Sequence, residues 1–212
     1  DTCSKGTSIT LRKYKQVPST DIDFGVVSFP AVDNLTNGDG YFIKSYHGDS
    51  VLACVMDGGR QKNQTENIDS IHCINSVLRA NYTKPLDEIL KICDTSIKNA
   101  DVIGGVNVAI LRITPTYIES AIIGSIKIFS YQNIEFDTRS YTGLLGRNLP
   151  VHINVTRTPR PITFHFALYS DGLVDVNYSS VPAGSNVQRF SEALFDHHAI
   201  AYDDSTILVL AG

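Results

Sequence analysis

The sequence predicts an α+β fold, an αββα sandwich in which two antiparallel sheets pack face to face with helices outside. Strand-like segments follow one another through short turns, and two consecutive helical patterns interrupt them. Two of the strands, residues 51–56 and 207–210, are apolar on both faces and therefore need cover on both sides. The length of 212 residues suits one domain over residues 1–212. The start at Asp1 is compatible with a domain excised from a longer polypeptide.

The first half of the chain is expected to form four strands and then two helices. The strands are predicted at residues 8–15, 24–29, 41–46 and 51–56. A turn-like segment around Gly48 joins the last two strands in a hairpin. Apolar residues recur at helical spacing over residues 68–78, and a second helical pattern follows Pro85 and continues to Ile97.

The second half is expected to be mostly strands. They are predicted at residues 106–113, 117–123, 126–131, 151–155, 162–169 and 205–210, with a loop at 142–147 and a short helix at 187–195.

Composition and charge narrow the classes of partner. The net charge is −4 and no stripe of Lys and Arg is present, which argues against nucleic acid. No apolar run reaches membrane-spanning length, and no signal-peptide pattern opens the chain. The four cysteines lack metal-ligand spacing, so we expect small buried apolar side chains in a reducing compartment. These are Cys3, Cys54, Cys73 and Cys93. We therefore expect a cytoplasmic protein, monomeric or weakly oligomeric, without a membrane or nucleic-acid partner.

Four acidic residues stand at the ends of predicted strands. Asp39 and Asp203 precede a strand, whereas Asp57 and Asp171 follow one. In antiparallel pairing the end of one strand lies beside the start of its neighbour, so all four carboxylates can reach one edge. Asp39 and Asp57 are equally distant from Gly48 and should face each other across the hairpin. Clustered carboxylates repel unless a cation neutralises them, and an all-oxygen set suits Mg²⁺ or Mn²⁺.

Each acidic motif has a plainer explanation when taken alone. Asp-Gly is a common turn dipeptide, and Asp203 with Asp204 could be solvated charge in a loop. The combination, in this order and in these strand contexts, is more specific. The histidines do not offer an alternative metal site. Adjacent His197 and His198 would point about 100° apart on a helix and could not easily bind the same ion. We interpret them as helix-end or surface histidines.

The order of these motifs resembles the PPM family of metal-dependent serine/threonine protein phosphatases. Within that family the chain is most similar to the compact bacterial branch with SpoIIE-like and RsbX-like members. The resemblance runs from about Phe24 to Leu210, and its best matches are Asp171-Gly172-Leu173 and Asp203-Asp204-Ser205-Thr206. Further matches are 105–111, 122–125 and 141–146.

The resemblance implies a role for each acid in a site that holds two Mn²⁺ or Mg²⁺ ions. Asp57 would bridge both ions, and the carbonyl of Gly58 would bind one of them. Asp39, Asp171 and Asp203 would complete the shell of the second ion. A metal-bound water would be the nucleophile that attacks phosphorus in line. The implied substrates are phosphorylated regulators of a bacterial partner-switching or stress-signalling pathway.

The loop after Asp57 departs from the family pattern. Relatives usually have small residues there, whereas this chain has Arg60 and other bulky polar residues over 59–64. Arg60 could bind the substrate phosphate through its planar guanidinium, or it could be a solvated surface arginine. The altered loop keeps an alternative open, a weakly active or inactive phosphatase fold that serves as a binding or scaffold module. A third reading is a metal-dependent hydrolase of small phosphorylated molecules.

Overall fold

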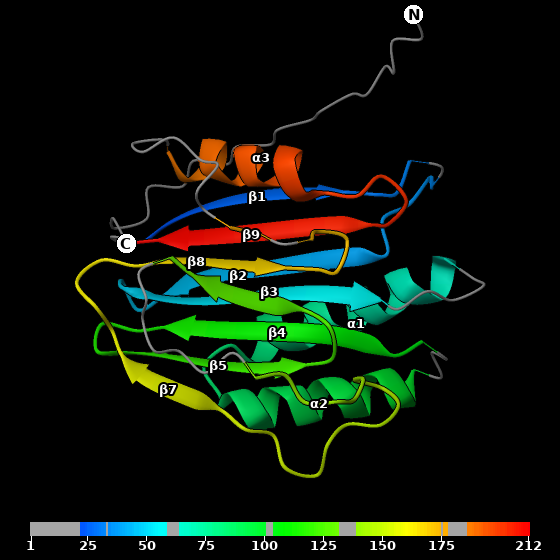
Figure 1. Cartoon of the computed structure of the whole chain (residues 1–212). Coiled ribbons are helices and arrows are strands. Elements are labelled where there is room, and N and C mark those ends of the chain that lie inside the picture. The colour runs from blue at the N-terminus through cyan, green and yellow to red at the C-terminus, as the bar shows by residue number, and fades with distance from the viewer. Residues whose placement is uncertain are drawn as a thin grey trace, which may run out of the picture.

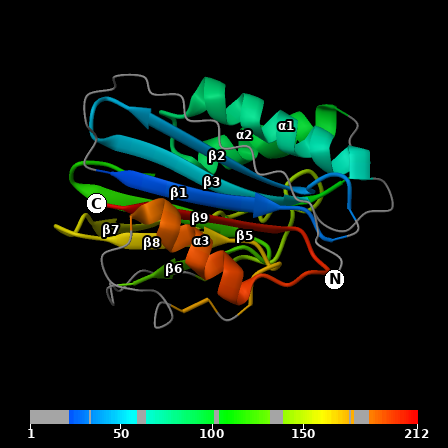
Figure 2. The same ribbon diagram turned by 90° about the horizontal axis from the view of Figure 1, so that it is seen from above.

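The chain folds into four layers, with two antiparallel sheets between two layers of helix (Figures 1 and 2). The computed structural model describes residues 22–32, 34–58, 64–100, 104–131, 139–174, 176–177 and 186–212. Helices α1 and α2 cover the outer face of one sheet, and α3 covers the outer face of the other. The predicted αββα sandwich is confirmed.

Within the described residues the two sheets have five and four strands, and every neighbouring pair is antiparallel. In spatial order the first sheet contains β2 (Asp39–Tyr46), β3 (Ser50–Gly58), β4 (Val106–Ile113), β5 (Tyr117–Ile123) and β7 (Thr156–Pro159). The second contains β1 (Asp23–Phe29), β9 (Ser205–Ala211), β8 (His165–Tyr169) and β6 (Lys127–Ser130). The helices are α1 (Gln64–Asn81), α2 (Leu86–Asn99) and α3 (Val187–His198).

Three hydrophobic cores fill the spaces between the four layers. One lies between α1/α2 and the five-stranded sheet, the second lies between the sheets, and the third lies beneath α3. Alternate residues of β3 belong to the first two cores, because successive strand side chains point to opposite faces. Leu52 and Met56 pack toward the helices, whereas Val51 and Val55 pack toward the other sheet. This explains why β3 is apolar without alternation.

The predicted hairpin forms in the expected register. Tyr46 pairs with Ser50 next to the turn, and Asp39 pairs with Asp57 at the open end. The turn contains two residues with positive φ, His47 at 49° and Gly48 at 81°. Glycine adopts this backbone without steric cost, so Gly48 favours the tight connection that sets the register.

The strand predicted at residues 151–155 is wrong. The edge strand β7 begins at Thr156, directly after the predicted segment ends, and pairs with β5. Val151 is 87% exposed, while Ile153 and Val155 pack against the core beneath α1 and α2 without strand pairing. The apolar alternation thus reflects packing of a loop rather than a ladder. Pro159 ends β7, as befits an edge strand, where a missing N–H is tolerated.

Other predictions differ at element ends or fall outside the described residues. The strand predicted at 162–169 begins only at His165, and Ile162 is 98% exposed. Cys54 and Cys93 are buried as expected, but Cys73 is only partly buried. The strand predicted at 8–15 and Cys3 lie outside the described residues. Within the described parts of the chain, no helix is long and apolar enough to cross a membrane.

Candidate metal-binding site

The structure brings the four predicted acids to one end of the sandwich. Asp39 and Asp57 pair across β2 and β3. Asp171 follows the end of β8 and Asp203 precedes the start of β9, at the end where Tyr169 pairs with Ile207. The two sheets are joined at this end by Ser170, whose hydroxyl donates to Asp39 Oδ2 at 2.6 Å.

Asp39 is the most deeply buried of the four acids and is only 8% exposed. Burial, and then the negative charge of Asp57, raise its pKa to about 8, although the hydrogen bond from Ser170 acts in the opposite direction. Ser170 is itself held in place, because its Oγ accepts a hydrogen bond from Thr206 N at 2.9 Å. The buried carboxyl group therefore has a fixed orientation and keeps its proton to a higher pH than an ordinary aspartate.

Asp57 is linked to the remaining two acids by its charge. Burial is the main cause that raises the pKa of Asp57 to about 6. The negative charges of Asp171 and, to a smaller extent, Asp203 raise this pKa further. Asn107 opposes this shift, because its Nδ2 donates to Asp57 Oδ2 at 2.8 Å. The Ser125 hydroxyl lies 3.5 Å from the same oxygen. Asp57 thus interacts electrostatically with Asp39, Asp171 and Asp203.

Sequence reasoning did not identify Asn107 as a site residue. It lies opposite Asp57 in the β3–β4 register, so its place follows once that register is known. Its Oδ1 accepts from Ser125 N at 3.2 Å, which fixes the amide orientation. Gly124 makes room for it, since a Cβ there would lie 1.9 Å from Asn107 Oδ1 and the backbone has a φ of 89°. Asn107 therefore orients the carboxylate of Asp57.

Asp204, the neighbour of Asp203, organises the loop that precedes Asp39. Its Oδ1 accepts from Ala31 N at 2.8 Å and from Asn34 Nδ2 at 3.3 Å. Its Oδ2 accepts from Gly38 N at 2.8 Å. Both carboxylate oxygens are engaged by these donors, so Asp204 acts here as a connector between the β1–β2 loop and the start of β9.

The remaining predicted residues occupy the rim of this end. Asp171 is exposed and begins a turn, and Asp203 is half-buried. Gly172 packs closely against the segment before β9, because a Cβ there would lie 2.0 Å from Asp204 O. Gly58 ends β3, and its N–H donates to Gly38 O at 3.1 Å. Arg60 and the rest of the loop at 59–63 lie outside the described residues.

The residues at this end suit a divalent cation by their chemistry. All the acids offer hard oxygen ligands. Burial and neighbouring carboxylates raise the pKa values of Asp39 and Asp57, and a bound cation would lower them. In the side-chain positions of the described residues, no group of three or more Asp, Glu, His or Cys is arranged to hold an ion.

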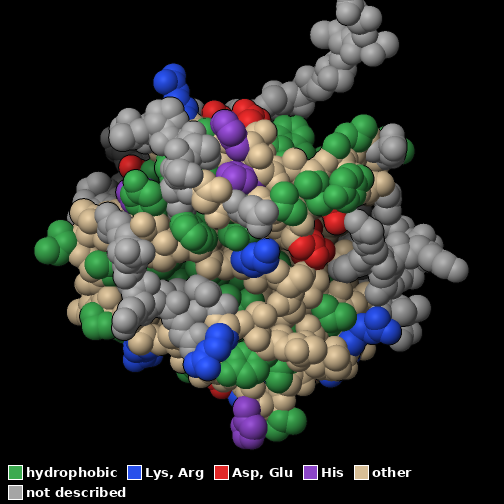
Figure 3. All heavy atoms as spheres, viewed as in Figure 1, with side chains coloured by type: hydrophobic (Ala, Val, Ile, Leu, Met, Phe, Trp, Pro, Cys, Tyr) green, Lys and Arg blue, Asp and Glu red, His purple; other side chains and the backbone are tan. Residues whose placement is uncertain are grey.

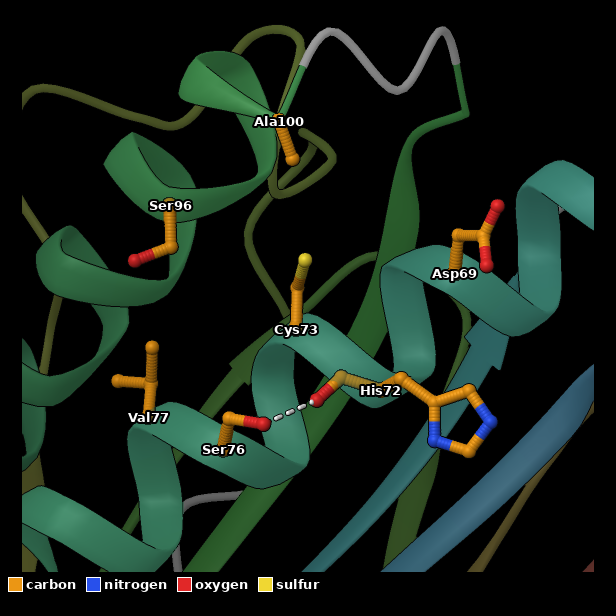
Figure 4. Close-up of a pocket in the computed structure, with 7 residues that line it drawn as sticks. All are labelled: Asp69, His72, Cys73, Ser76, Val77, Ser96 and Ala100. Atoms are coloured by element: carbon orange, nitrogen blue, oxygen red, sulfur yellow. Dashed lines mark hydrogen bonds between the residues drawn. The ribbon is translucent and has the colours of Figure 1, made fainter.

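Two other features lie apart from the acids. Of the two histidines at the end of α3, His197 is exposed, whereas His198 is buried and its Nδ1 lies 3.0 Å from Val174 O. Both histidines lie in the last turn of α3, as expected for helix-end residues, and only His197 is also at the surface. A cavity of about 500 Å³ lies between α1 and α2 and is lined by none of the predicted site residues. Figure 4 shows that Asp69 and His72 in its wall point away from Cys73, so these side chains do not converge on a ligand.

Solved structures of several phosphatases share the fold of this chain. RsbX in complex with magnesium matches with a TM-score of 0.77 at 19% identity, over 90% of this chain and 94% of that chain. The Mycobacterium tuberculosis serine/threonine phosphatase PstP matches with a TM-score of 0.66 at 12% identity, over 89% and 97%.

The phosphatase domain of the Bacillus subtilis cell-fate determinant SpoIIE matches at 14% identity and a TM-score of 0.65. That match covers 92% of this chain and 64% of the SpoIIE chain. No protein-family profile and no curated protein matches the sequence. The predicted resemblance is confirmed at the level of the fold.

Proposed function

We propose that this protein is a metal-dependent phosphoserine/phosphothreonine protein phosphatase. The observation that carries the proposal is the set of four acids at one end of a PPM-type sandwich, two of them with raised pKa values. A binding module would gain nothing from carboxylates that repel one another, whereas a hydrolase that uses divalent cations requires them.

In this proposal Asp57 and the carbonyl of Gly58 would hold one of two Mn²⁺ or Mg²⁺ ions. Asp57, together with Asp39, Asp171 and Asp203, would hold the other. The bound ions would supply an activated water and neutralise the phosphoryl oxygens. The protein's own contribution is orientation, because Ser170 fixes Asp39 and Asn107 fixes Asp57.

The finer assignments rest on the similarity to RsbX and SpoIIE. The substrates would be phosphorylated regulators of a bacterial partner-switching or stress-response pathway. We place the protein in the cytoplasm as a monomer or weak oligomer. Arg60 is the candidate phosphate-binding residue.

The test is hydrolysis of p-nitrophenyl phosphate and of a phosphothreonine peptide with Mn²⁺, with and without a chelator. We expect turnover that the chelator abolishes and that Asp57→Asn reduces by at least about 100-fold, since that carboxylate would contact both ions. Absence of metal-dependent turnover on both substrates would reject the enzyme and favour the scaffold module. Turnover of the small substrate alone would favour a hydrolase of small phosphorylated molecules.

A further inference from the structure

Exposed hydrophobic side chains border the acidic end of the sandwich on two adjacent loops. Phe29 (48% exposed), Val32 (76%) and Leu35 (97%) lie at the end of β1 and in the β1–β2 loop. Tyr202 (76%) lies in the loop between α3 and β9. The two loops touch, because Val32 N donates to Ala201 O at 2.9 Å. We call Phe29, Val32, Leu35 and Tyr202 the apolar rim.

The apolar rim is tied to the acids by short connections. The carboxylate of Asp204 binds Ala31 N and Gly38 N, on either side of the loop segment that carries the rim. Tyr202 directly precedes Asp203 in the chain. On the right-hand side of Figure 3, hydrophobic side chains lie beside acidic ones at this end of the molecule. A molecule that places a phosphate at the acids and extends beyond it would therefore cover the rim.

The apolar character and the area of the rim limit what can bind there. Residues 29–40 and 199–206 contain no Lys and no Arg, so the charged side chains of these segments are all Asp. Apolar side chains of a partner would gain from burial against the rim. Four partly exposed side chains offer on the order of 500 Å², below the roughly 800 Å² per partner of a stable interface. This area suits a transient contact better than a permanent dimer.

On the basis of the proposed function, we propose that the apolar rim docks the polypeptide around the phosphorylated residue of the substrate. It selects phosphoserine or phosphothreonine segments that carry aliphatic or aromatic side chains beside the phosphorylated residue. The acids would receive the phosphate, and the rim would provide the preference for a protein over a small phosphomonoester.

The experiment compares three substrates in Mn²⁺: p-nitrophenyl phosphate, a phosphothreonine peptide with Leu and Val flanks, and the same peptide with Ser flanks. The test variant is the double substitution Val32→Ser, Leu35→Ser, at exposed positions where folding is not at risk. The matched control is Ile162→Ser, which changes a 98% exposed side chain before β8, at the end of that strand away from Asp171.

We expect wild type to prefer the Leu/Val-flanked peptide. The double variant should lower kcat/KM on that peptide about 10-fold and change kcat/KM on the other two substrates by less than about twofold. The control substitution should leave kcat/KM on all three substrates unchanged. Loss of p-nitrophenyl phosphate turnover to the same degree, or no loss on the apolar peptide, would overturn the docking proposal while leaving the phosphatase intact.

Two further outcomes separate the alternatives. Absence of wild-type turnover on all three substrates would reject the proposed function, and the docking proposal with it. In analytical ultracentrifugation, wild type could sediment as a dimer and the double variant as a monomer. That result would show that the rim binds a second copy of the chain, and it would overturn the proposal.

Discussion

The raised pKa of Asp39 predicts that the metal-free protein becomes less stable as the pH rises. The folded state keeps a proton on Asp39 up to about pH 8, whereas an aspartate in the unfolded chain loses it near its ordinary value of 3.8. Between these values the folded state binds one more proton than the unfolded state. The free energy of unfolding should then fall by about 1.4 kcal/mol per pH unit.

The raised pKa of Asp39 therefore lowers the free energy of unfolding by at most about 4 kcal/mol at pH 7, and this loss vanishes below about pH 4. Asp57, with its pKa raised to about 6, adds to the slope between pH 4 and 6. The substitution Asp39→Asn removes the Asp39 penalty, because an amide does not ionise. Part of the gain is lost to the buried amide, so we expect Asp39→Asn to be more stable than wild type by about 1–3 kcal/mol at pH 7 without metal.

The assay is urea unfolding at pH 5, 6, 7 and 8 in chelator, repeated with Mn²⁺. The advantage of Asp39→Asn should shrink toward pH 5 and reverse in sign with Mn²⁺, which binds the carboxylate. Asp49→Asn is the matched control, because Asp49 is an exposed aspartate at the turn of the same hairpin. It should change stability by less than about 0.5 kcal/mol. Asp39→Asn that is less stable than wild type in chelator at every pH would refute the reasoning.

Three further predictions concern single residues. Mn²⁺ should raise the Tm of wild type, and Asp57→Asn should remove most of that shift, so equal shifts in both proteins would reject Asp57 as a ligand. Asp204→Ala removes the acceptor for two backbone N–H groups, so it should lower the free energy of unfolding in urea by about 1–3 kcal/mol and also lower kcat. Unchanged stability would contradict the role of Asp204 as a connector. Arg60→Ala should raise the KM for a phosphopeptide about 10-fold with a smaller change in kcat. Unchanged KM and kcat would mean that Arg60 does not bind the substrate phosphate.

Local patterns were sufficient for most of the fold because strands, turns and helices each have a short-range signature. Strand alternation, the glycine turn at Gly48 and the two helical periods predicted the layers and the hairpin register. The apolar alternation at residues 151–155 led to a wrong strand prediction, because the same alternation also arises when a loop packs on a core. The pairing partner of an edge strand depends on which edge is open, and that is a property of the assembled sheet.

The positions of the acids at strand ends could be read from the sequence, since chain direction and antiparallel pairing are enough to bring them to one edge. The groups that orient those acids were decided only by the tertiary structure. Ser170 meets Asp39 across 131 positions of the chain, and Asn107 meets Asp57 across 50. Such contacts depend on the register between distant strands and on the approach of two sheets, and no local signal encodes either. The sequence by itself therefore indicates which chemistry is present at this end, and the packing of the two sheets determines how each carboxylate is held.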